Sequence, residues 1–275
     1  MKQLLYLSLV IFGGAFVGSC GLISEPSELN DSDSLVLDSL VVEELEFTTK
    51  KTAFVDSLEQ NGVMLRYSVE IDVPVTGPKA LLDSVKTWMN NTLGGSYNGV
   101  IDFNNEMLRH YAELYYDDNS DVLSIVDFIG CSLDLKIQMT DNTDGFVSYE
   151  VEGYDYTGGA HGMPISYGTT FVKETGSTLS WDMFSDTTNI APLFKQSVVQ
   201  YFAKDSITSL DEVLFEEAAA HFPLPTQTPW LVSDGVKFCY GAYEIAPYAA
   251  GMPSGVIPTN KISKYLVEDV RKLLK

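Results

Sequence analysis

Hydrophobic and polar side chains alternate along residues 63–73, VMLRYSVEIDV. Strict alternation is typical of a β-strand with one buried face, because successive side chains of a strand point to opposite sides. Pro74 and the pair Gly77-Pro78 end the pattern. We therefore expect a long, half-buried strand. The side chains expected on its buried face are Val63, Leu65, Tyr67, Val69, Ile71 and Val73.

The spacing of hydrophobic residues then changes to that of an α-helix. A first stripe runs from Leu81 to Leu93 and ends before Gly94-Gly95, a pair that favours a helix C-terminus. A second helix is predicted over residues 104–116. The side chains expected to point inward from the second helix are Met107, Leu108, Tyr111, Leu114 and Tyr115.

Strand-like alternation returns after this helical region. Residues 133–139 alternate again, residues 141–145 (DNTDG) have the composition of a turn, and residues 146–156 form the returning strand. A further hairpin is predicted over residues 165–181, with its turn at Glu174-Thr175-Gly176.

Helical spacing dominates the next part of the chain. A stripe over residues 190–202 predicts a helix, and its proline falls in the first turn, where proline is tolerated. Ser209 and Glu212 have the spacing of a capping box and predict a second helix over residues 213–222. The remaining predicted elements are strands within residues 230–251 and an amphipathic helix over residues 259–274.

This order of elements predicts an α+β fold with a largely antiparallel sheet packed with several helices. A division between two α+β modules is expected near residue 145, after the DNTDG turn. The predicted modules are residues 50–144 and residues 145–275, and the two could share one sheet.

The N-terminus resembles a bacterial lipoprotein signal. Met1 and Lys2 precede an uncharged apolar run that ends at Val17-Gly18-Ser19-Cys20. The run is short for a membrane span, and small residues before a cysteine are typical of a lipobox. The resemblance implies a signal peptide over residues 1–19, lipid on Cys20, and a place in the cell envelope, at the periplasmic or surface side of an outer membrane. The alternative is an ordinary signal peptide with an incidental cysteine.

Acidic residues dominate the segment that follows. Residues 24–49 contain eight acidic residues and no lysine or arginine, which predicts a flexible tether over residues 20–49. A short helix or strand within residues 36–45 is the alternative. Removal of residues 1–19 changes the net charge from −21 to −22, because it takes away one lysine. So acidic a chain is not expected to bind nucleic acid or anionic lipid headgroups.

Few residue types that support catalysis occur in a recognisable pattern. The chain has no Gly-x-Ser-x-Gly, His-Glu-x-x-His or Cys-x-x-Cys motif and no phosphate-binding glycine loop. Cys131 and Cys239 lie in strand-like stretches, where they could form a disulfide or remain as buried thiols. His110 and His221 are expected to be packed or surface residues. We therefore expect no cofactor and no metal ion.

One loop favours a more specific role. Residues 154–163, YDYTGGAHGM, place three glycines and a histidine directly after a strand. One interpretation is structural: the glycines permit positive φ and close backbone approach, and His161 holds the loop. Another is a loop made rigid for ligand contact. A third is an enzymatic site built on His161 and Asp155.

Two stretches carry a resemblance to a known family. Residues 154–184, which begin with this loop, and residues 243–251, YEIAPYAAG, together resemble the extracellular domain of RsiV-type anti-sigma factors. The same domain is similar to the accessory region of PdaC-type polysaccharide deacetylases and is known as domain-of-unknown-function family 3298. The resemblance covers residues 145–274, and residues 55–140 resemble the companion module that precedes this domain.

The resemblance implies a binding protein rather than an enzyme. RsiV-type relatives bind lysozyme, but they carry a transmembrane helix and a sigma-binding segment that this sequence lacks, so we expect no anti-sigma role. The deacetylase relatives keep catalysis in a separate domain, so we carry over no catalytic residue. The positions carried over as ligand-binding candidates are Tyr156, Gly158, Gly159, His161 and Gly162 in the first motif, and Tyr243, Glu244, Pro247, Tyr248 and Gly251 in the second.

We therefore expect a lipid-anchored, non-enzymatic envelope protein that binds a protein, such as a lysozyme-like enzyme, or a wall glycan. The exposed tyrosines of the two motifs are suitable contact residues. The alternative is that Tyr243 and Glu244 connect the two motifs inside the fold. The rival function is a hydrolase or deacetylase-like enzyme that acts on wall glycans through His161 and Asp155. A third alternative is a purely structural envelope lipoprotein, with neither ligand nor turnover.

Overall fold

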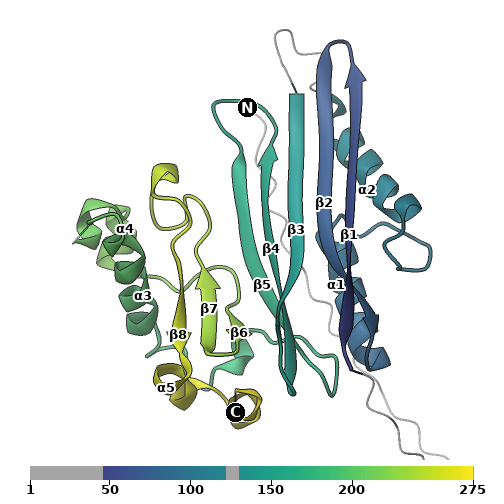
Figure 1. The fold of residues 1–275 in the computed structure, drawn as a ribbon. Coiled ribbons are helices and arrows are strands. Elements are labelled where there is room, and N and C mark those ends of the chain that lie inside the picture. The colour runs from purple at the N-terminus through teal and green to yellow at the C-terminus, as the bar shows by residue number, and fades with distance from the viewer. Residues whose placement is uncertain (1–45, 122–129, 208, 275) are drawn as a thin grey trace, which may run out of the picture. The chain divides into compact units, whose positions relative to one another are not determined.

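The computed structural model describes residues 46–121, 130–207 and 209–274 (Figure 1). The predicted signal peptide, Cys20 and most of the predicted tether lie outside these residues. Thr48 and Thr49 already belong to strand β1 (Thr48–Gln60), so the folded part begins before the expected boundary at residue 50. No helix among the described residues is long and apolar enough to cross a membrane.

A five-stranded sheet forms the N-terminal part of the fold. Its strands lie in the order β1-β2-β3-β4-β5. Only β2 and β3 pair in parallel, and all other neighbours are antiparallel. The remaining bounds are β2 (Val63–Thr76), β3 (Gly130–Asn142), β4 (Phe146–Tyr156) and β5 (Met163–Val172). The predicted α+β class and largely antiparallel sheet are confirmed.

Helices α1 (Lys79–Thr92) and α2 (Asn105–Asp118) connect β2 to β3 and cover one face of this sheet (Figure 1). A parallel pair needs such a crossover, because a tight hairpin can join only antiparallel strands. The inward face predicted for β2 is confirmed, since all six side chains are buried in a cluster with residues of both helices. Asn104 begins α2 by accepting a hydrogen bond from the Met107 amide at 2.9 Å.

A smaller sheet of three strands, β6-β7-β8, forms the C-terminal part together with short helices. A second hydrophobic cluster lies between this sheet and helix α3 (Ala191–Ala203). The remaining strands are β6 (Trp230–Val232), β7 (Gly235–Cys239) and β8 (Ser254–Pro258). The other helices are α4 (Glu216–Ala220), α5 (Thr259–Ile262) and α6 (Glu268–Leu273), with 3₁₀ turns η2 (Trp181–Met183), η3 (Leu210–Glu212), η4 (Tyr248–Ala250) and η5 (Ser263–Tyr265).

Two predicted helices are wrong in extent, because tertiary contacts override the local pattern. Ser209 makes no side-chain cap, and the Phe215 amide bonds to the Ile245 carbonyl at 2.9 Å, so only five residues form α4. The helix predicted over residues 259–274 breaks before α6, where the Val267 amide donates to the Met183 carbonyl at 2.9 Å.

Other differences concern strands. The alternation analysis did not predict β1 or β8. The hairpin expected over residues 165–181 turns where predicted, but its return is only an isolated bridge between Phe171 and Thr178. The return does not continue as a strand because the chain enters the 3₁₀ turn η2 at Trp181.

Glu150 of β4 joins the two sheets. Its carboxylate accepts a hydrogen bond from Trp230 Nε1 at 3.0 Å and forms an ion pair with Lys237 Nζ at 2.6 Å. The Trp230 ring lies against Gly168 of β5, where an added Cβ would be 2.3 Å from the indole. The small sheet therefore covers one end of the large sheet's open face, and a buried carboxylate satisfies both donors.

We expect Glu150→Ala to lower the free energy of unfolding by about 2 kcal/mol, because it leaves the buried Trp230 N–H without its acceptor and the partly exposed Lys237 ammonium without its ion pair. Urea denaturation followed by tryptophan fluorescence measures this change. The matched control is Glu152→Ala on the same strand face, whose exposed side chain should cost less than about 0.5 kcal/mol. Equal effects of the two substitutions would contradict the role given to Glu150.

Candidate functional site

The two motifs meet in a group of stacked rings on the surface. The His161 ring lies on the Tyr248 ring with centroids 3.7 Å apart and planes 20° apart. Tyr243 lies next to both, at 6.3 Å from His161 and 5.7 Å from Tyr248. With Tyr154, whose hydroxyl supports this arrangement, these residues make up what we call the aromatic cluster. His161 is exposed, and Tyr154 and Tyr243 keep 37% and 48% of their surface accessible.

The glycines of the first motif shape the loop that carries His161. Gly158 and Gly159 have φ angles of 101° and 87°, which residues with a side chain rarely adopt. The Tyr156 hydroxyl donates to the Gly159 carbonyl at 3.1 Å. A Cβ on Gly162 would lie 2.4 Å from the Asp155 carbonyl oxygen, so only glycine fits there. These glycines therefore serve the conformation of the loop.

Both nitrogens of His161 have partners. Nδ1 lies 3.0 Å from the Gly162 carbonyl and Nε2 lies 3.2 Å from the Tyr243 hydroxyl. A carbonyl can only accept, so Nδ1–H donates to it, and in the neutral ring Nε2 accepts from Tyr243. The histidine therefore anchors the first motif to the second.

The backbone of the second motif is held in an unusual conformation. Tyr243 has a φ of 65°, which is uncommon for any residue but glycine. Glu244 fixes it, since its carboxylate accepts from the Gly241 amide at 2.6 Å and from the Thr226 amide and hydroxyl at 2.6 and 2.9 Å. Glu244 is thus occupied inside the loop, while the Tyr243 ring projects outward.

Pro247 and Gly251 border the 3₁₀ turn η4, which carries Tyr248. Gly251 has a φ of 73°, and a Cβ there would approach the Tyr201 hydroxyl to 2.9 Å. A hydrogen bond with Tyr154 raises the pKa of Tyr248 above its usual range. Tyr154 also accepts from the Gly162 amide at 2.6 Å. Tyr154 was missed as a site residue, because alternation indicates only which face a side chain occupies.

Asp155 and His161 are not brought together. Tyr154 and Tyr156 project from one face of β4, and Asp155 projects from the other, toward Tyr115 of α2 and Cys131 of β3. Burial raises the pKa of the Asp155 carboxyl, and interaction with the Tyr115 hydroxyl partly opposes this. No group of three or more His, Cys, Asp or Glu side chains that could hold a metal ion occurs in the described parts of the chain.

The remaining candidate groups are buried or solitary. Cys131 and Cys239 are both buried free thiols, so the disulfide alternative does not hold. Burial raises the pKa of the Cys239 thiol to about 11, which leaves little thiolate at neutral pH. The His110 ring packs near Tyr97 and Tyr111, and His221 is exposed beyond α4. None of the four forms part of the aromatic cluster.

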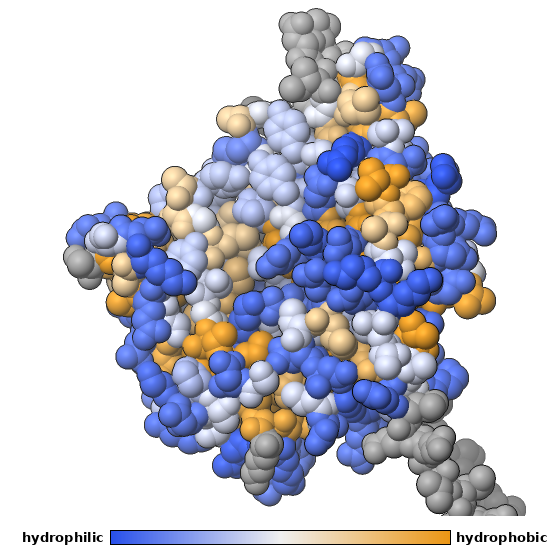
Figure 2. Space-filling model, in the orientation of Figure 1, coloured by the Kyte–Doolittle hydropathy of each residue, from blue (hydrophilic) through white to orange (hydrophobic). Residues whose placement is uncertain are grey.

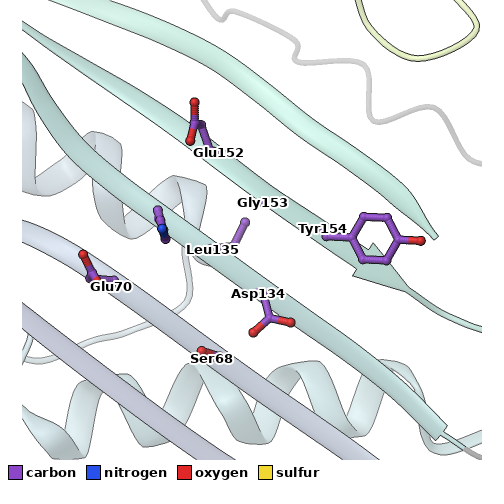
Figure 3. Close-up of a pocket in the computed structure, with 8 residues that line it drawn as sticks. Ser68, Glu70, Asp134, Leu135, Glu152, Gly153 and Tyr154 are labelled. Carbon is purple, nitrogen blue, oxygen red and sulfur yellow. The ribbon is translucent and has the colours of Figure 1, made fainter. Parts of the chain in front are cut away.

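A groove of about 400 Å³ adjoins the aromatic cluster on the open face of the large sheet. Figure 3 shows its carboxylates on three neighbouring strands, with Tyr154 at one end. The polar side of β2 and β3 was predictable for Ser68, Glu70, Asp134 and Lys136, but the gathering of these residues with those of β4 into a groove was not. The lining residues are Ser68, Glu70, Asp134, Leu135, Lys136, Glu152, Gly153 and Tyr154.

The fold and site define a two-sheet α+β protein whose exposed aromatic cluster joins two separate segments. Residues 66–164 match the family described as deacetylase PdaC, and residues 182–260 match the family described as protein of unknown function DUF3298. We call these matching stretches the PdaC segment and the DUF3298 segment. The expected resemblance to these two families is confirmed. Among curated proteins, none matches this sequence.

Two solved structures of DUF3298 family proteins have a similar fold. One, from Bacteroides fragilis, is 20% identical with a TM-score of 0.67, and the match covers 84% of this chain and 97% of that chain. The other, from Pseudomonas aeruginosa, is 18% identical with a TM-score of 0.55, and the match covers 82% and 96% respectively. At these identities the likeness concerns the fold alone.

The two motifs lie in different family segments. The loop of residues 154–162 is in the PdaC segment, whereas residues 243–251 are in the DUF3298 segment. The boundary predicted near residue 145 would put both motifs in one module, and it falls between β3 and β4, which pair in one sheet. The aromatic cluster is therefore built jointly by the two segments.

We expect Asp155→Asn to stabilise the fold at pH 7, because it removes a charge whose oxygen Oδ1 is buried without a hydrogen-bond partner among the described groups. Because its pKa is raised, the Asp155 carboxyl binds a proton more tightly in the folded state than in the unfolded state. The contribution of this carboxyl to the stability of the fold is therefore present at low pH and lost as pH rises. The advantage of the variant should therefore shrink as pH falls toward 3.8, the ordinary value.

Urea denaturation at pH 7 and pH 4 measures this difference. Asp211→Asn, at an exposed aspartate of η3, is the control and should show no such pH-dependent gap. A variant less stable than the wild type at pH 7 would show instead that the Asp155 carboxylate is satisfied in the fold.

Proposed function

We propose that the chain is a non-enzymatic binding module of the bacterial cell envelope, and that the aromatic cluster is its ligand-contact surface. The observation that carries this proposal is the convergence of two motifs, 82 residues apart, on one exposed stack. A turn needed only by the fold has no reason to leave a tyrosine ring in solvent at the cost of a positive φ.

The cluster has the properties of a contact surface. Exposed tyrosines offer large apolar area with a polar tip, and they lose little conformational entropy on binding. Here the rings are held before any ligand arrives, since His161 bonds to Tyr243 and Gly162, and Tyr154 bonds to Gly162. Such preorganisation reduces the entropic cost of association.

Two kinds of ligand fit this surface. A wall glycan can stack the apolar faces of its sugar rings on tyrosine rings. A cationic protein such as a lysozyme-like enzyme would be attracted by the net charge of −22 that remains after removal of residues 1–19. The glycan is a component of the bacterial wall, and a lysozyme-like enzyme attacks that wall. Both ligands therefore agree with the envelope location that the lipobox favours.

The rival function, a hydrolase or deacetylase-like enzyme, has less support. The first matching family is named for a deacetylase. However, His161 uses both ring nitrogens within the cluster, and Asp155 lies on the opposite face of its strand. General acid–base catalysis by this pair would require the two side chains to face one substrate.

Replacement of the exposed rings should remove binding without unfolding the protein. Tyr243→Ala or Tyr248→Ala in the full-length chain should weaken the interaction with insoluble peptidoglycan or with lysozyme by about thirtyfold, the size of an interface hot spot. Co-sedimentation measures binding to insoluble peptidoglycan, and binding to surface-immobilised lysozyme measures the interaction with lysozyme. Thermal unfolding of each variant checks that the fold is retained.

Phe215→Ala is the matched control, because Phe215 is an aromatic residue of similar exposure, 39%, outside the cluster. It should leave binding within twofold of the wild type, roughly the range of a neutral interface position. Absence of binding in both arms, or variants that bind like the wild type, would disprove the proposed contact surface.

The proposed lipid anchor predicts that the chain partitions with bacterial membranes and incorporates radiolabelled palmitate. Cys20→Ala should abolish both, because the thiol is the attachment point and several acyl chains are needed for stable anchoring. Cys131→Ala, which leaves the lipobox intact, should abolish neither. Label that persists in Cys20→Ala would disprove lipidation at this residue.

A further inference from the structure

The groove next to the aromatic cluster has an ordered pattern of polar groups. Its floor consists of two rows that cross strands β2, β3 and β4. In one row Ser68 is opposite Asp134, and Asp134 is opposite Tyr154. In the second, Glu70 is opposite Lys136, and Lys136 is opposite Glu152. Figure 2 shows that this face carries many hydrophilic residues across its centre.

Strand geometry sets the dimensions of this pattern. Neighbouring strands lie about 4.8 Å apart, and side chains two residues apart on one strand are separated by about 7 Å. Three strands and two rows therefore place six side chains over an area of about 10 by 7 Å. Together with a volume of about 400 Å³, this area is large enough for one or two sugar rings.

Two of the carboxylates are already held in place. Arg66 donates to both oxygens of Asp134, at 3.1 and 3.4 Å, and Lys51 pairs with Glu70 at 3.0 Å. These ion pairs neutralise the two acids and fix their orientation, but they leave lone pairs free for further donors. In the described parts of the chain, Lys136 and Glu152 make no ion pair. The Lys136 ammonium can therefore donate to a ligand, and the Glu152 carboxylate can accept from it.

Both ends of the groove are defined by contacts described above. Tyr154 stands at one end, and its hydroxyl is fixed by Gly162, so the ring keeps its position beside the polar rows. At the other end, Glu150 is the next outward residue on β4 after Glu152, and Trp230 covers it. The groove is therefore an uncovered strip between the small sheet and the aromatic cluster.

We propose that this groove is a saccharide-binding subsite in which a sugar ring stacks on Tyr154 and its hydroxyl groups bond to Asp134, Lys136 and Glu152. The inference rests on the proposed binding function and extends it from the aromatic cluster to the sheet face. Sugar hydroxyls donate and accept, which matches a lining that alternates carboxylates with a lysine and a serine. An aromatic wall beside such groups binds the apolar face of the ring.

Other ligands fit the groove less well. An apolar peptide would have to cover charged side chains on all three strands without offering donors to their oxygens. A basic side chain would meet Lys136 in the centre of the row and two acids already paired with Arg66 and Lys51. A protein interface needs about 800 Å² on each partner, whereas the groove spans about 10 by 7 Å.

Titration of the full-length chain in detergent with N-acetylglucosamine oligomers and with glucose oligomers tests the subsite. Calorimetry should detect binding of at least one series, with little dependence on salt because the ligand is neutral. Glu152→Gln and Asp134→Asn should each weaken it about tenfold, since each removes a charged acceptor of a sugar hydroxyl. Glu113→Gln, an exposed position on α2, is the matched control and should leave the affinity unchanged.

The results also separate this inference from the proposed function. If Tyr243→Ala abolishes peptidoglycan or lysozyme binding while Glu152→Gln and Asp134→Asn do not affect any ligand, the aromatic cluster is confirmed and the subsite is disproved. If neither oligomer series binds at millimolar concentration, the subsite is likewise disproved. Salt-sensitive binding of oligolysine in place of the saccharides would replace it with a site for basic chains.

Discussion

The pairing of Glu150 with Trp230 and Lys237 holds the C-terminal part of the fold on the large sheet, beside hydrogen bonds of Leu231 to the same sheet. A carboxylate this buried is costly to desolvate unless its oxygens find donors, and both donors come from the small sheet. The small sheet therefore cannot shift along β4 without leaving a charge unpaired. Since the aromatic cluster needs residues from both segments, its geometry depends on this ion pair.

Strand β4 connects the structural and functional features of the molecule. Its outward residues follow each other at intervals of two: Glu150 holds the small sheet, Glu152 lines the groove, and Tyr154 ends the groove and supports the His161 loop. The period of a strand puts all three on one face. A change in the register of β4 by one residue would turn Asp155 outward. It would also remove the contact of Glu150 with the small sheet, the groove, and the hydrogen bond of Tyr154 to the His161 loop.

Sequence patterns predicted the parts of the fold whose stability is local. Alternation identified β2 and β3, the turn composition of residues 141–145 indicated β4 as the returning strand, and hydrophobic stripes identified α1, α2 and α3. Patterns failed where distant backbone groups compete: Val267 donates to Met183 instead of continuing a helix, and Phe215 donates to Ile245. For the site, the motifs identified His161, Tyr243 and Tyr248, but Tyr154 and the groove required knowledge of strand register.

The strained backbone at Tyr243 connects stability to function. Glu244 accepts from Gly241 and Thr226, and these hydrogen bonds hold the preceding residue at a φ of 65°. In this conformation the Tyr243 hydroxyl lies 3.2 Å from His161 Nε2. Because the cluster is exposed and buries little surface, its contacts contribute little to the stability of the fold. The hydrogen bonds of Glu244 offset the strain energy of the Tyr243 backbone instead. The position of the projecting ring is thus set by the loop and not by packing of the ring itself.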